Sequence, residues 1–358
     1  MKLAAARRAL DNAPKPETAP IDLSKNMKPL CLTTALPYAT AEPDIPELEM
    51  RVLRGLPAEA PWPEEDAGRV EVIFATHPPP NLSAFKHLRW LQIESAGYSH
   101  LFPHRLAQRG VTVTNARGIF DCPIAEWNIA MMINLARDLR TLIRHQDAAI
   151  WERSARFTGE IRGRTVGIWG YGGIGRETAR LAKAMGMRVH VLARSATKSR
   201  SDSTCIPGTG DPDGSLPDQY FTQEEKAAFL SSLDFLILAV PLTGRTEGML
   251  GEAELRLLPK GAFVLNPARG PLIQEQALLA VLRDGHLGGA ALDTHYQYPL
   301  PPEHPLWAFP HVILTPHISG TTFSPHFQTE MVRIFYENAR RYIAGQPLLN
   351  VVPPADLQ

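Results

Sequence analysis

Short apolar runs and longer amphipathic stretches alternate along the chain, which is the pattern of an α/β protein. The short apolar runs predict strands over residues 30–34, 70–75, 88–93, 111–115, 166–169, 188–193, 233–240, 262–266, 288–293 and 312–315. Helical spacing of apolar positions is strongest over residues 124–140, and further helices are expected over residues 43–56, 177–185 and 325–344. Strands that alternate with helices favour parallel sheets with helices on both faces.

A glycine-rich turn stands where one of these strands passes into a helix. Residues 165–176 read TVGIWGYGGIGR. In such a turn Gly170 permits the tight bend, Gly172 lets the backbone approach a pyrophosphate, and Gly175 lets the helix pack on the strand. The start of the helix presents free N–H groups to phosphates. A lone GxGxxG also occurs in ordinary turns, but the flanking strand and helix and the next strand over 188–193 predict a dinucleotide site. The candidate cofactor contacts are Gly170, Tyr171, Gly172, Gly173, Ile174 and Gly175.

The residues after the second strand of this unit bear on the choice of cofactor. An acidic residue at this point binds the adenosine ribose hydroxyls, but Arg194 and Ser195 stand here instead. A guanidinium offers two hydrogen bonds to a 2′-phosphate, so we expect NADP(H) to be preferred over NAD(H). The alternative is a solvated loop charge with poor selectivity. The polar segment 197–220 that follows either covers the cofactor or is a surface insertion.

Four later strands end in polar residues. The strand over 233–240 leads to Thr243 through Pro241 and Leu242, the strand over 262–266 leads to Arg269, and the next two lead to Asp293 and His317. In an open parallel sheet, ligands bind at the carboxyl ends of the strands. The sequence therefore predicts that these residues face one ligand.

Composition restricts the function without naming it. The formal net charge is zero, and no apolar stretch approaches the length of a membrane span, so neither nucleic acid nor a membrane is expected as a partner. Cys31, Cys122 and Cys205 lack the spacing of a zinc site or a disulfide framework, which favours a reducing, cytoplasmic location and no metal. Residues 1–28 resemble a loose N-terminal arm, with organelle targeting as a weaker alternative.

The glycine turn is followed, in order, by PLTGRT, NPARG, ALD and TPHISG. In this order and spacing the motifs resemble the D-isomer-specific 2-hydroxyacid dehydrogenase family, which includes the glyoxylate/hydroxypyruvate reductases. The resemblance implies two Rossmann-like domains and a homodimer. A doubly wound parallel cofactor domain of residues 124–323 would be inserted into a smaller flavodoxin-like substrate domain of residues 29–123 plus 324–358.

The resemblance also assigns roles to residues. Arg269 would hold the substrate carboxylate and polarise the neighbouring carbonyl, and His317 would be the acid–base group. Asp293 would meet the nicotinamide carboxamide. The backbone of a substrate loop and the remaining cofactor contacts would come from Ala96, Gly97, Tyr98, Val240, Pro241, Thr246, Pro267, Ala268 and Gly320.

One position departs from the family pattern. A Glu usually follows the Asp by five residues and raises the pKa of the catalytic His, but Tyr298 stands in that place. A neutral phenol can orient His317 without stabilising an imidazolium, so neutral His317 should be favoured. Formate dehydrogenase-like members also lack this Glu. However, residues 118–122 lack the Asn with which those enzymes bind formate.

We therefore expect an NAD(P)-dependent enzyme that transfers hydride between a nicotinamide cofactor and a 2-oxoacid or D-2-hydroxyacid. Two alternatives stay open: a dehydrogenase of a formate- or phosphite-like donor, and a catalytically weak binding protein that senses the cofactor. The size of the substrate is also open. Four aromatic residues would either line a pocket for a substrate larger than glyoxylate or belong to the core or to dimer contacts: Tyr98, Phe120, Tyr296 and Trp307.

Overall fold

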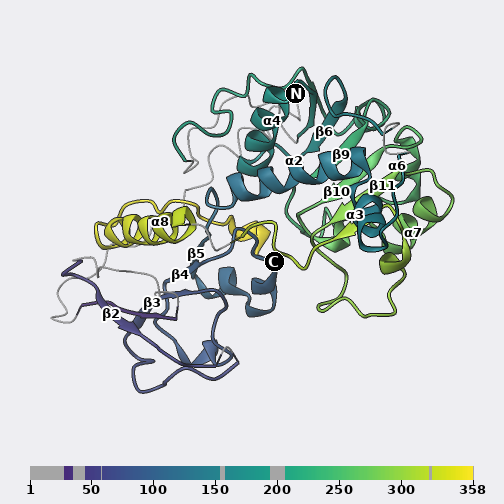
Figure 1. Cartoon of the computed structure of the whole chain (residues 1–358). Coiled ribbons are helices and arrows are strands. Elements are labelled where there is room, and N and C mark those ends of the chain that lie inside the picture. The colour runs from purple at the N-terminus through teal and green to yellow at the C-terminus, as the bar shows by residue number, and fades with distance from the viewer. Residues whose placement is uncertain are drawn as a thin grey trace.

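The computed structural model describes residues 28–34, 45–57, 59–153, 158–193, 206–321 and 325–357. The smaller of its two sheets has the strands β1 (Leu30–Thr33), β2 (Glu49–Val52), β3 (Val70–Ala75), β4 (Trp90–Ile93) and β5 (Thr112–Thr114). All neighbouring strands are parallel, in the order β2-β1-β3-β4-β5. This is the flavodoxin-like order. The sheet occupies the lower part of Figure 1.

The larger sheet has seven parallel strands in the order β12-β11-β10-β9-β6-β7-β8. They are β6 (Thr165–Trp169), β7 (Arg188–Leu192), β8 (Gln219–Phe221), β9 (Phe235–Leu238), β10 (Phe263–Asn266), β11 (Gly289–Leu292) and β12 (Val312–Leu314). The order reverses at β6, as in a Rossmann sheet, so the glycine turn after β6 lies at the topological switch point. The α/β prediction is confirmed.

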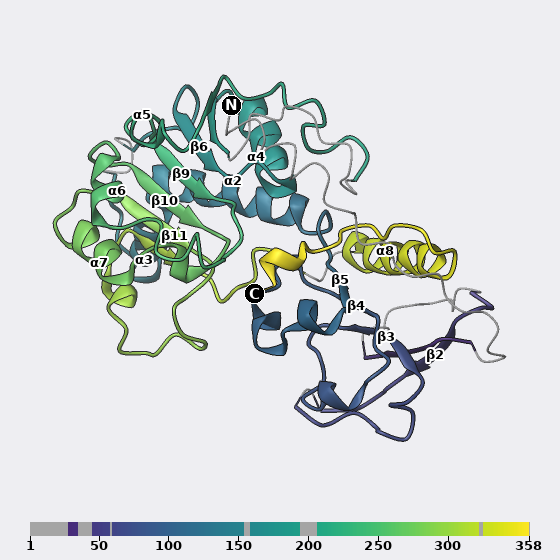
Figure 2. The same ribbon diagram turned by 180° about the vertical axis from the view of Figure 1, so that it is seen from behind.

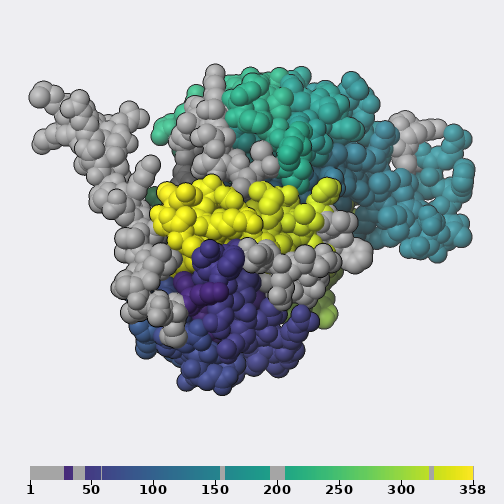
Figure 3. All heavy atoms as spheres, turned by 90° about the vertical axis from the view of Figure 1, so that its left-hand side faces the viewer, coloured from purple at the N-terminus to yellow at the C-terminus, as the bar shows by residue number. Residues whose placement is uncertain are grey.

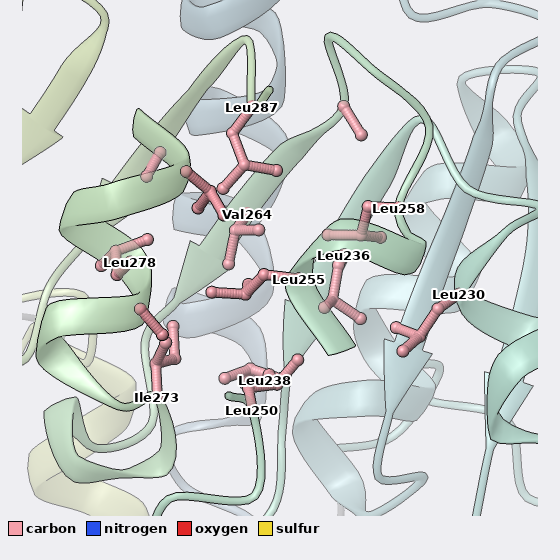
Figure 4. Packing of buried hydrophobic residues seen from close by; sticks show 14 of the residues in the cluster. Leu230, Leu236, Leu238, Leu250, Leu255, Leu258, Val264, Ile273, Leu278 and Leu287 are labelled. Atoms are coloured by element: carbon pink, nitrogen blue, oxygen red, sulfur yellow. The ribbon is translucent and has the colours of Figure 1, made fainter. Parts of the chain in front are cut away.

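Helices cover both faces of the larger sheet. The α-helices among the described residues are α2 (Asp121–Arg137), α3 (Leu139–Asp147), α4 (Gly173–Ala184), α5 (Lys226–Leu230), α6 (Glu252–Leu257), α7 (Glu275–Arg283) and α8 (Pro325–Ile343). Side chains alternate along β9: Phe235 and Ile237 join the core beneath α2 and α4, while Leu236 and Leu238 join the core beneath α5, α6 and α7. Figure 2 shows α5, α6 and α7 around this sheet, and Figure 4 shows the leucine-rich packing between them and the strands.

The last long helix packs on the smaller sheet, although it follows the larger one in sequence. Phe335 of α8 stacks on Phe74 of β3 at 4.3 Å between ring centroids and lies 5.6 Å from Trp90 of β4. In Figure 3, α8 (yellow) lies directly over the purple and blue residues of the first strands. The C-terminal residues also join this unit, since Val352 and Leu357 lie in the core on the other face of the sheet.

Two predictions of local structure are wrong. Residues 49–52 form strand β2, at the edge of the sheet, and not part of a helix over 43–56. The helix expected over 124–140 ends at Arg137, because Asp138 adopts a left-handed conformation with φ of 50°. The next helix, α3, begins at Leu139. Arg194 and Ser195 lie outside the described residues. Among those described, no helix has the length and hydrophobicity of a membrane span.

Candidate active site

The glycine turn after β6 has the geometry that a pyrophosphate requires. Gly170 has a φ of 103°, which L side chains rarely adopt, and a Cβ there would meet the carbonyl of Ala239. A Cβ at Gly175 would likewise meet the carbonyl of Gly170. Gly172 is extended and precedes Gly173, the first residue of α4. The residues therefore fit a dinucleotide, with the start of α4 facing its phosphates.

A segment from the polar insertion packs against this turn. The Tyr171 hydroxyl donates a hydrogen bond of 2.6 Å to the carboxylate of Asp211, and the Arg176 guanidinium lies 4.7 Å from the centre of the Tyr171 ring. Gly210 N–H donates to Glu177 of α4 at 2.6 Å. Asp211, Arg176 and Glu177 are all buried. This part of the insertion thus braces the cofactor turn and the first turns of α4.

Side-chain hydrogen bonds shape the turns at the ends of β9 and β10. Thr246 Oγ1 donates to the carbonyl of Pro241 at 2.7 Å. Asn266 Oδ1 accepts from the N–H groups of Ala268 and Arg269, and its amide nitrogen donates to the carbonyl of Arg269 at 2.8 Å. Asn266 therefore fixes the backbone that carries Arg269.

The Arg269 guanidinium meets the loop that follows β4 in the smaller sheet. A Cβ on Gly97 would collide with the guanidinium, so the two groups are in direct contact. The loop is held by Asn115, whose side-chain amide donates to the carbonyl of Ala96 at 2.7 Å. Burial lowers the pKa of Arg269 below its ordinary value, which Tyr298 partly opposes. A poorly hydrated guanidinium beside backbone N–H groups is suited to hold a carboxylate.

His317 is positioned by the buried carboxylate of Asp293. This carboxylate accepts hydrogen bonds from the backbone N–H groups of Ile318 and Ser319, each at 2.9 Å, and from the Thr315 hydroxyl. These bonds hold His317 in a left-handed conformation with a φ of 58°. Partial burial and the positive charges of Arg269 and His295 lower the pKa of His317, while Asp293 raises it.

Tyr298 contacts His317 through its ring. The two ring centroids are 5.7 Å apart with an angle of 52° between the planes. The Tyr298 hydroxyl accepts a hydrogen bond of 3.3 Å from the backbone N–H of His295, and no hydrogen bond joins it to His317 among those of the described residues. Tyr298 is 58% exposed. It therefore borders His317 without supplying the negative charge of a carboxylate.

The predicted residues collect at the carboxyl ends of the strands of both sheets. Residues 170–175 form the turn after β6. Val240, Pro241 and Thr246 follow β9, and Pro267, Ala268 and Arg269 follow β10. Asp293 and Tyr298 follow β11, and His317 and Gly320 follow β12. Ala96, Gly97 and Tyr98 follow β4. Of these, Tyr98 turns its ring into the core of the smaller unit, and its hydroxyl donates to Asp356 at 3.4 Å.

Sequence reasoning missed several polar residues of this region. Asn266 and Asp211 act through hydrogen bonds that only the folded chain makes. His77, Glu94 and His100 lie at the ends of β3 and β4, and His100 is close enough to Arg269 for its charge to affect the pKa of the imidazole. For His77 and Glu94, the position just after an apolar run was the available signal. No cluster of potential metal ligands is found among the described residues.

Comparisons with known proteins agree with this geometry. The family model for the D-isomer specific 2-hydroxyacid dehydrogenase NAD binding domain matches residues 129–319. A glyoxylate reductase of Aeropyrum pernix is 30% identical over 278 residues, which are 76% of this chain and 78% of the relative. Glyoxylate/hydroxypyruvate reductase B of Yersinia enterocolitica is 30% identical over 274 residues, 76% of this chain and 79% of the relative.

A solved structure is similar over nearly the whole chain. It is the NADPH-dependent glyoxylate/hydroxypyruvate reductase of Sinorhizobium meliloti in complex with NADP and sulfate, at 25% identity and a TM-score of 0.73, covering 93% of this chain and all of that one.

A Rossmann sheet whose ligand edge carries an arginine and a histidine, opposite a second α/β sheet, defines a nicotinamide-dependent oxidoreductase. The chain belongs to the D-isomer-specific 2-hydroxyacid dehydrogenase family. It is an NAD(P)-dependent enzyme that transfers hydride between the cofactor and 2-oxoacids or 2-hydroxyacids. The formate-like donor and the cofactor-sensing protein are not favoured, because the relatives are named as reductases and dehydrogenases of 2-hydroxyacids.

Proposed function

We propose that this enzyme reduces a small 2-oxoacid of the glyoxylate type to the 2-hydroxyacid, with NADPH as its preferred cofactor. The observation that carries the proposal is the contact between the Arg269 guanidinium and Gly97. This contact joins a charged group of the cofactor sheet to the loop of the smaller sheet. A carboxylate bound there accepts hydrogen bonds from both. The names of the relatives support the substrate class.

In this proposal the residues of the chain bind, orient and protonate the substrate. Arg269 and the N–H groups of the loop around Gly97 hold the carboxylate, and the guanidinium polarises the adjacent carbonyl. The bound nicotinamide supplies hydride to C2. As the C2–O double bond opens, its electron pair takes the proton from His317, which leaves a neutral imidazole and a 2-hydroxyacid. Asp293 keeps His317 in position through the backbone of Ile318 and Ser319.

We propose NADP(H) over NAD(H) on two grounds. Arg194 follows β7, where an acid that binds the ribose hydroxyls is absent from the sequence. In addition, the similar structure of the Sinorhizobium meliloti enzyme is a complex with NADP. Arg194 provides a fork of N–H donors that suits a 2′-phosphate.

The test is the oxidation of NADPH and of NADH at saturating glyoxylate, with Arg194→Ala and Lys260→Ala as matched variants. Lys260 is an exposed residue before β10, at the opposite end of the strands from the cofactor turn. We expect NADPH to be preferred, and Arg194→Ala to raise the KM for NADPH about tenfold or more with little effect on NADH. Equal use of both cofactors by the unchanged enzyme would contradict the cofactor proposal, and no turnover with either would contradict the function.

We further propose that two domains meet at this site, residues 29–123 plus 324–358 and residues 124–323. The packing of α8 on β3 and β4 supports the discontinuous unit, since Phe335 stacks on Phe74. The N-terminal arm expected over residues 1–28 lies, up to residue 27, outside the described residues. Substrate would then bind between the two units, because Gly97 belongs to one and Arg269 to the other.

A homodimer and a cytoplasmic location complete the proposal. Three large apolar side chains of α3 and the residues after it are exposed, Ile143 at 56%, Ile150 at 54% and Trp151 at 91%. This teal-blue segment projects from the body of the molecule in Figure 3. An exposed apolar projection of this kind supports burial against a second copy.

Cys31 and Cys122 are free thiols, in agreement with a reducing compartment.

A further inference from the structure

A second imidazole lies close to His317 and has no role in the proposed reaction. His295 stands two residues after Asp293, in the segment that follows β11, and it is buried. Its backbone packs on the turn that carries Arg269, since a Cβ on Gly270 would meet the carbonyl group of His295.

The ring of His295 is hydrogen-bonded to the end of β12. Its Nε2 atom lies 2.8 Å from the backbone carbonyl oxygen of Thr315. A carbonyl oxygen can only accept a hydrogen bond, so Nε2 carries a proton and is the donor. The other ring nitrogen, Nδ1, is buried and makes no hydrogen bond to any of the residues that the structure describes. Within that part of the chain, the bond to Thr315 is therefore the hydrogen bond that orients the ring.

Thr315 connects His295 to His317. The same carbonyl oxygen accepts a second hydrogen bond, of 3.0 Å, from the backbone N–H of His317. The Thr315 hydroxyl donates to the carboxylate of Asp293 at 2.5 Å. The carbonyl that binds the N–H of His317 is thus itself fixed by the imidazole of His295.

The backbone of His317 requires such support. Its φ of 58° is in the left-handed region, which costs free energy for any residue with a side chain and persists only where the surroundings impose it. On the carboxyl side, the next two N–H groups bind the carboxylate of Asp293. On the amino side, the N–H of His317 binds Thr315. Asp293 and His295 therefore anchor the two sides of His317 from one segment of the chain.

We propose that His295 is a positioning residue for the reduction: through the carbonyl of Thr315, its Nε2–H holds His317 in the orientation from which the proton is given. The inference rests on the proposed function, in which His317 is the acid. Tyr298 contacts the His317 ring, but no hydrogen bond joins the two among those of the described residues. The orientation of the imidazole thus depends on the backbone that His295 and Asp293 anchor.

The test measures kcat and KM for glyoxylate reduction by NADPH in His295→Gln and His295→Asn. The amide nitrogen of Gln reaches as far as Nε2 and keeps a donor for Thr315, whereas the amide nitrogen of Asn reaches only as far as Nδ1. We expect His295→Asn to lower kcat about tenfold and to change both KM values less than about threefold, because Arg269 and the cofactor turn are untouched. His295→Gln should retain most of kcat.

A double variant separates positioning from a general effect on the fold. In His317→Ala no imidazole is left to position, so adding His295→Asn should lower kcat by less than about twofold further. The matched control is His87→Asn, which should keep the kcat of the unchanged enzyme. His87 is exposed and precedes β4, at the end of that strand away from Gly97.

Several results would overturn the inference. They are an unchanged kcat in His295→Asn, an equal loss of kcat in His295→Asn and His295→Gln, and a loss in the His317→Ala background as large as in the unchanged one. Failure of the unchanged enzyme to reduce glyoxylate, or full activity of His317→Ala, would overturn the proposed function or its mechanism, and this inference with it.

Discussion

At the scale of single residues, the charge on His317 is set by what surrounds it. Arg269 and His295 bring positive charge, and only the carboxylate of Asp293 opposes them among the groups that shift its pKa. The Asp293 carboxylate accepts hydrogen bonds from the backbone N–H groups of Ile318 and Ser319. Tyr298 adds a ring and no charge. The proton of His317 is thus held weakly, which suits its transfer to a substrate oxygen.

A carboxylate at position 298 should change this balance. In Tyr298→Glu an acidic group would stand near the imidazole, stabilise its protonated form and raise the pKa of His317. Reduction requires protonated His317, so kcat/KM for glyoxylate reduction falls as pH rises through that pKa. We expect this fall to move up by about 1 pH unit, the low end of the usual 1–3, because Tyr298 is 58% exposed and water screens the charge.

The control for this experiment is Tyr298→Phe, assayed over the same pH range. It keeps the ring against His317 and removes only the hydroxyl that accepts from His295. Its profile should match that of the unchanged enzyme. If Tyr298→Glu left the pH profile in place while both variants stayed folded, position 298 would not control the proton on His317.

At the scale of secondary structure, six of the seven strands of the larger sheet were predictable because each is an apolar run with polar residues after it. The exception is β8 (Gln219–Phe221), a short edge strand with an exposed Gln219 at the end of the polar insertion. The rule that ligands bind at the carboxyl ends of parallel strands then brought Arg269, Asp293 and His317 together. Helix periodicity failed at residues 49–52, where tertiary pairing with β1 decides the conformation. It also could not locate the end of α2, since that depends on the backbone conformation of Asp138.

The packing of the polar insertion, residues 197–220, could not be predicted from the sequence for a different reason. Its composition left open whether it covers the cofactor or lies on the surface, and the part from residue 206 onward packs on the cofactor turn. The contact depends on three buried charged side chains: Asp211 accepts from the Tyr171 hydroxyl, Arg176 donates to the carbonyl of Asp211, and Glu177 accepts from the Gly210 N–H. Charged residues are ordinarily read from sequence as solvated, so this packing could not be foreseen.

The projection that contains α3 carries a prediction of its own. Burial of a large aromatic side chain contributes about 1.5–3 kcal/mol, so Trp151→Glu should weaken or abolish a dimer that this segment forms. Sedimentation velocity should give twice the mass of one chain for the unchanged protein and a shift toward one chain for the variant. The matched control, Met185→Glu, alters an apolar side chain that is 40% exposed after α4 and should leave the mass unchanged. A monomeric unchanged protein would refute the dimer.

At the scale of the whole molecule, two parallel α/β units present the carboxyl ends of their strands to one another, and α8 returns to the first unit. The sequence motifs revealed this arrangement because each occurs at a strand end in an order shared with the family. The sequence motifs did not predict that His77, Glu94 and His100 lie near this site. His77 meets His100 only in the folded smaller unit, and His100 comes near Arg269 only when the two sheets face each other.

The most direct test of the proposed mechanism is glyoxylate-dependent oxidation of NADPH at neutral pH by the unchanged enzyme and by His317→Ala. General acid catalysis by a positioned histidine contributes about 10²–10⁴ in rate, so kcat should fall by that factor in the variant. Binding of NADPH, followed by its fluorescence, should stay the same, which shows that the cofactor site is intact. If His317→Ala reduced glyoxylate as fast as the unchanged enzyme, His317 would not be the proton donor and the proposed mechanism would be wrong.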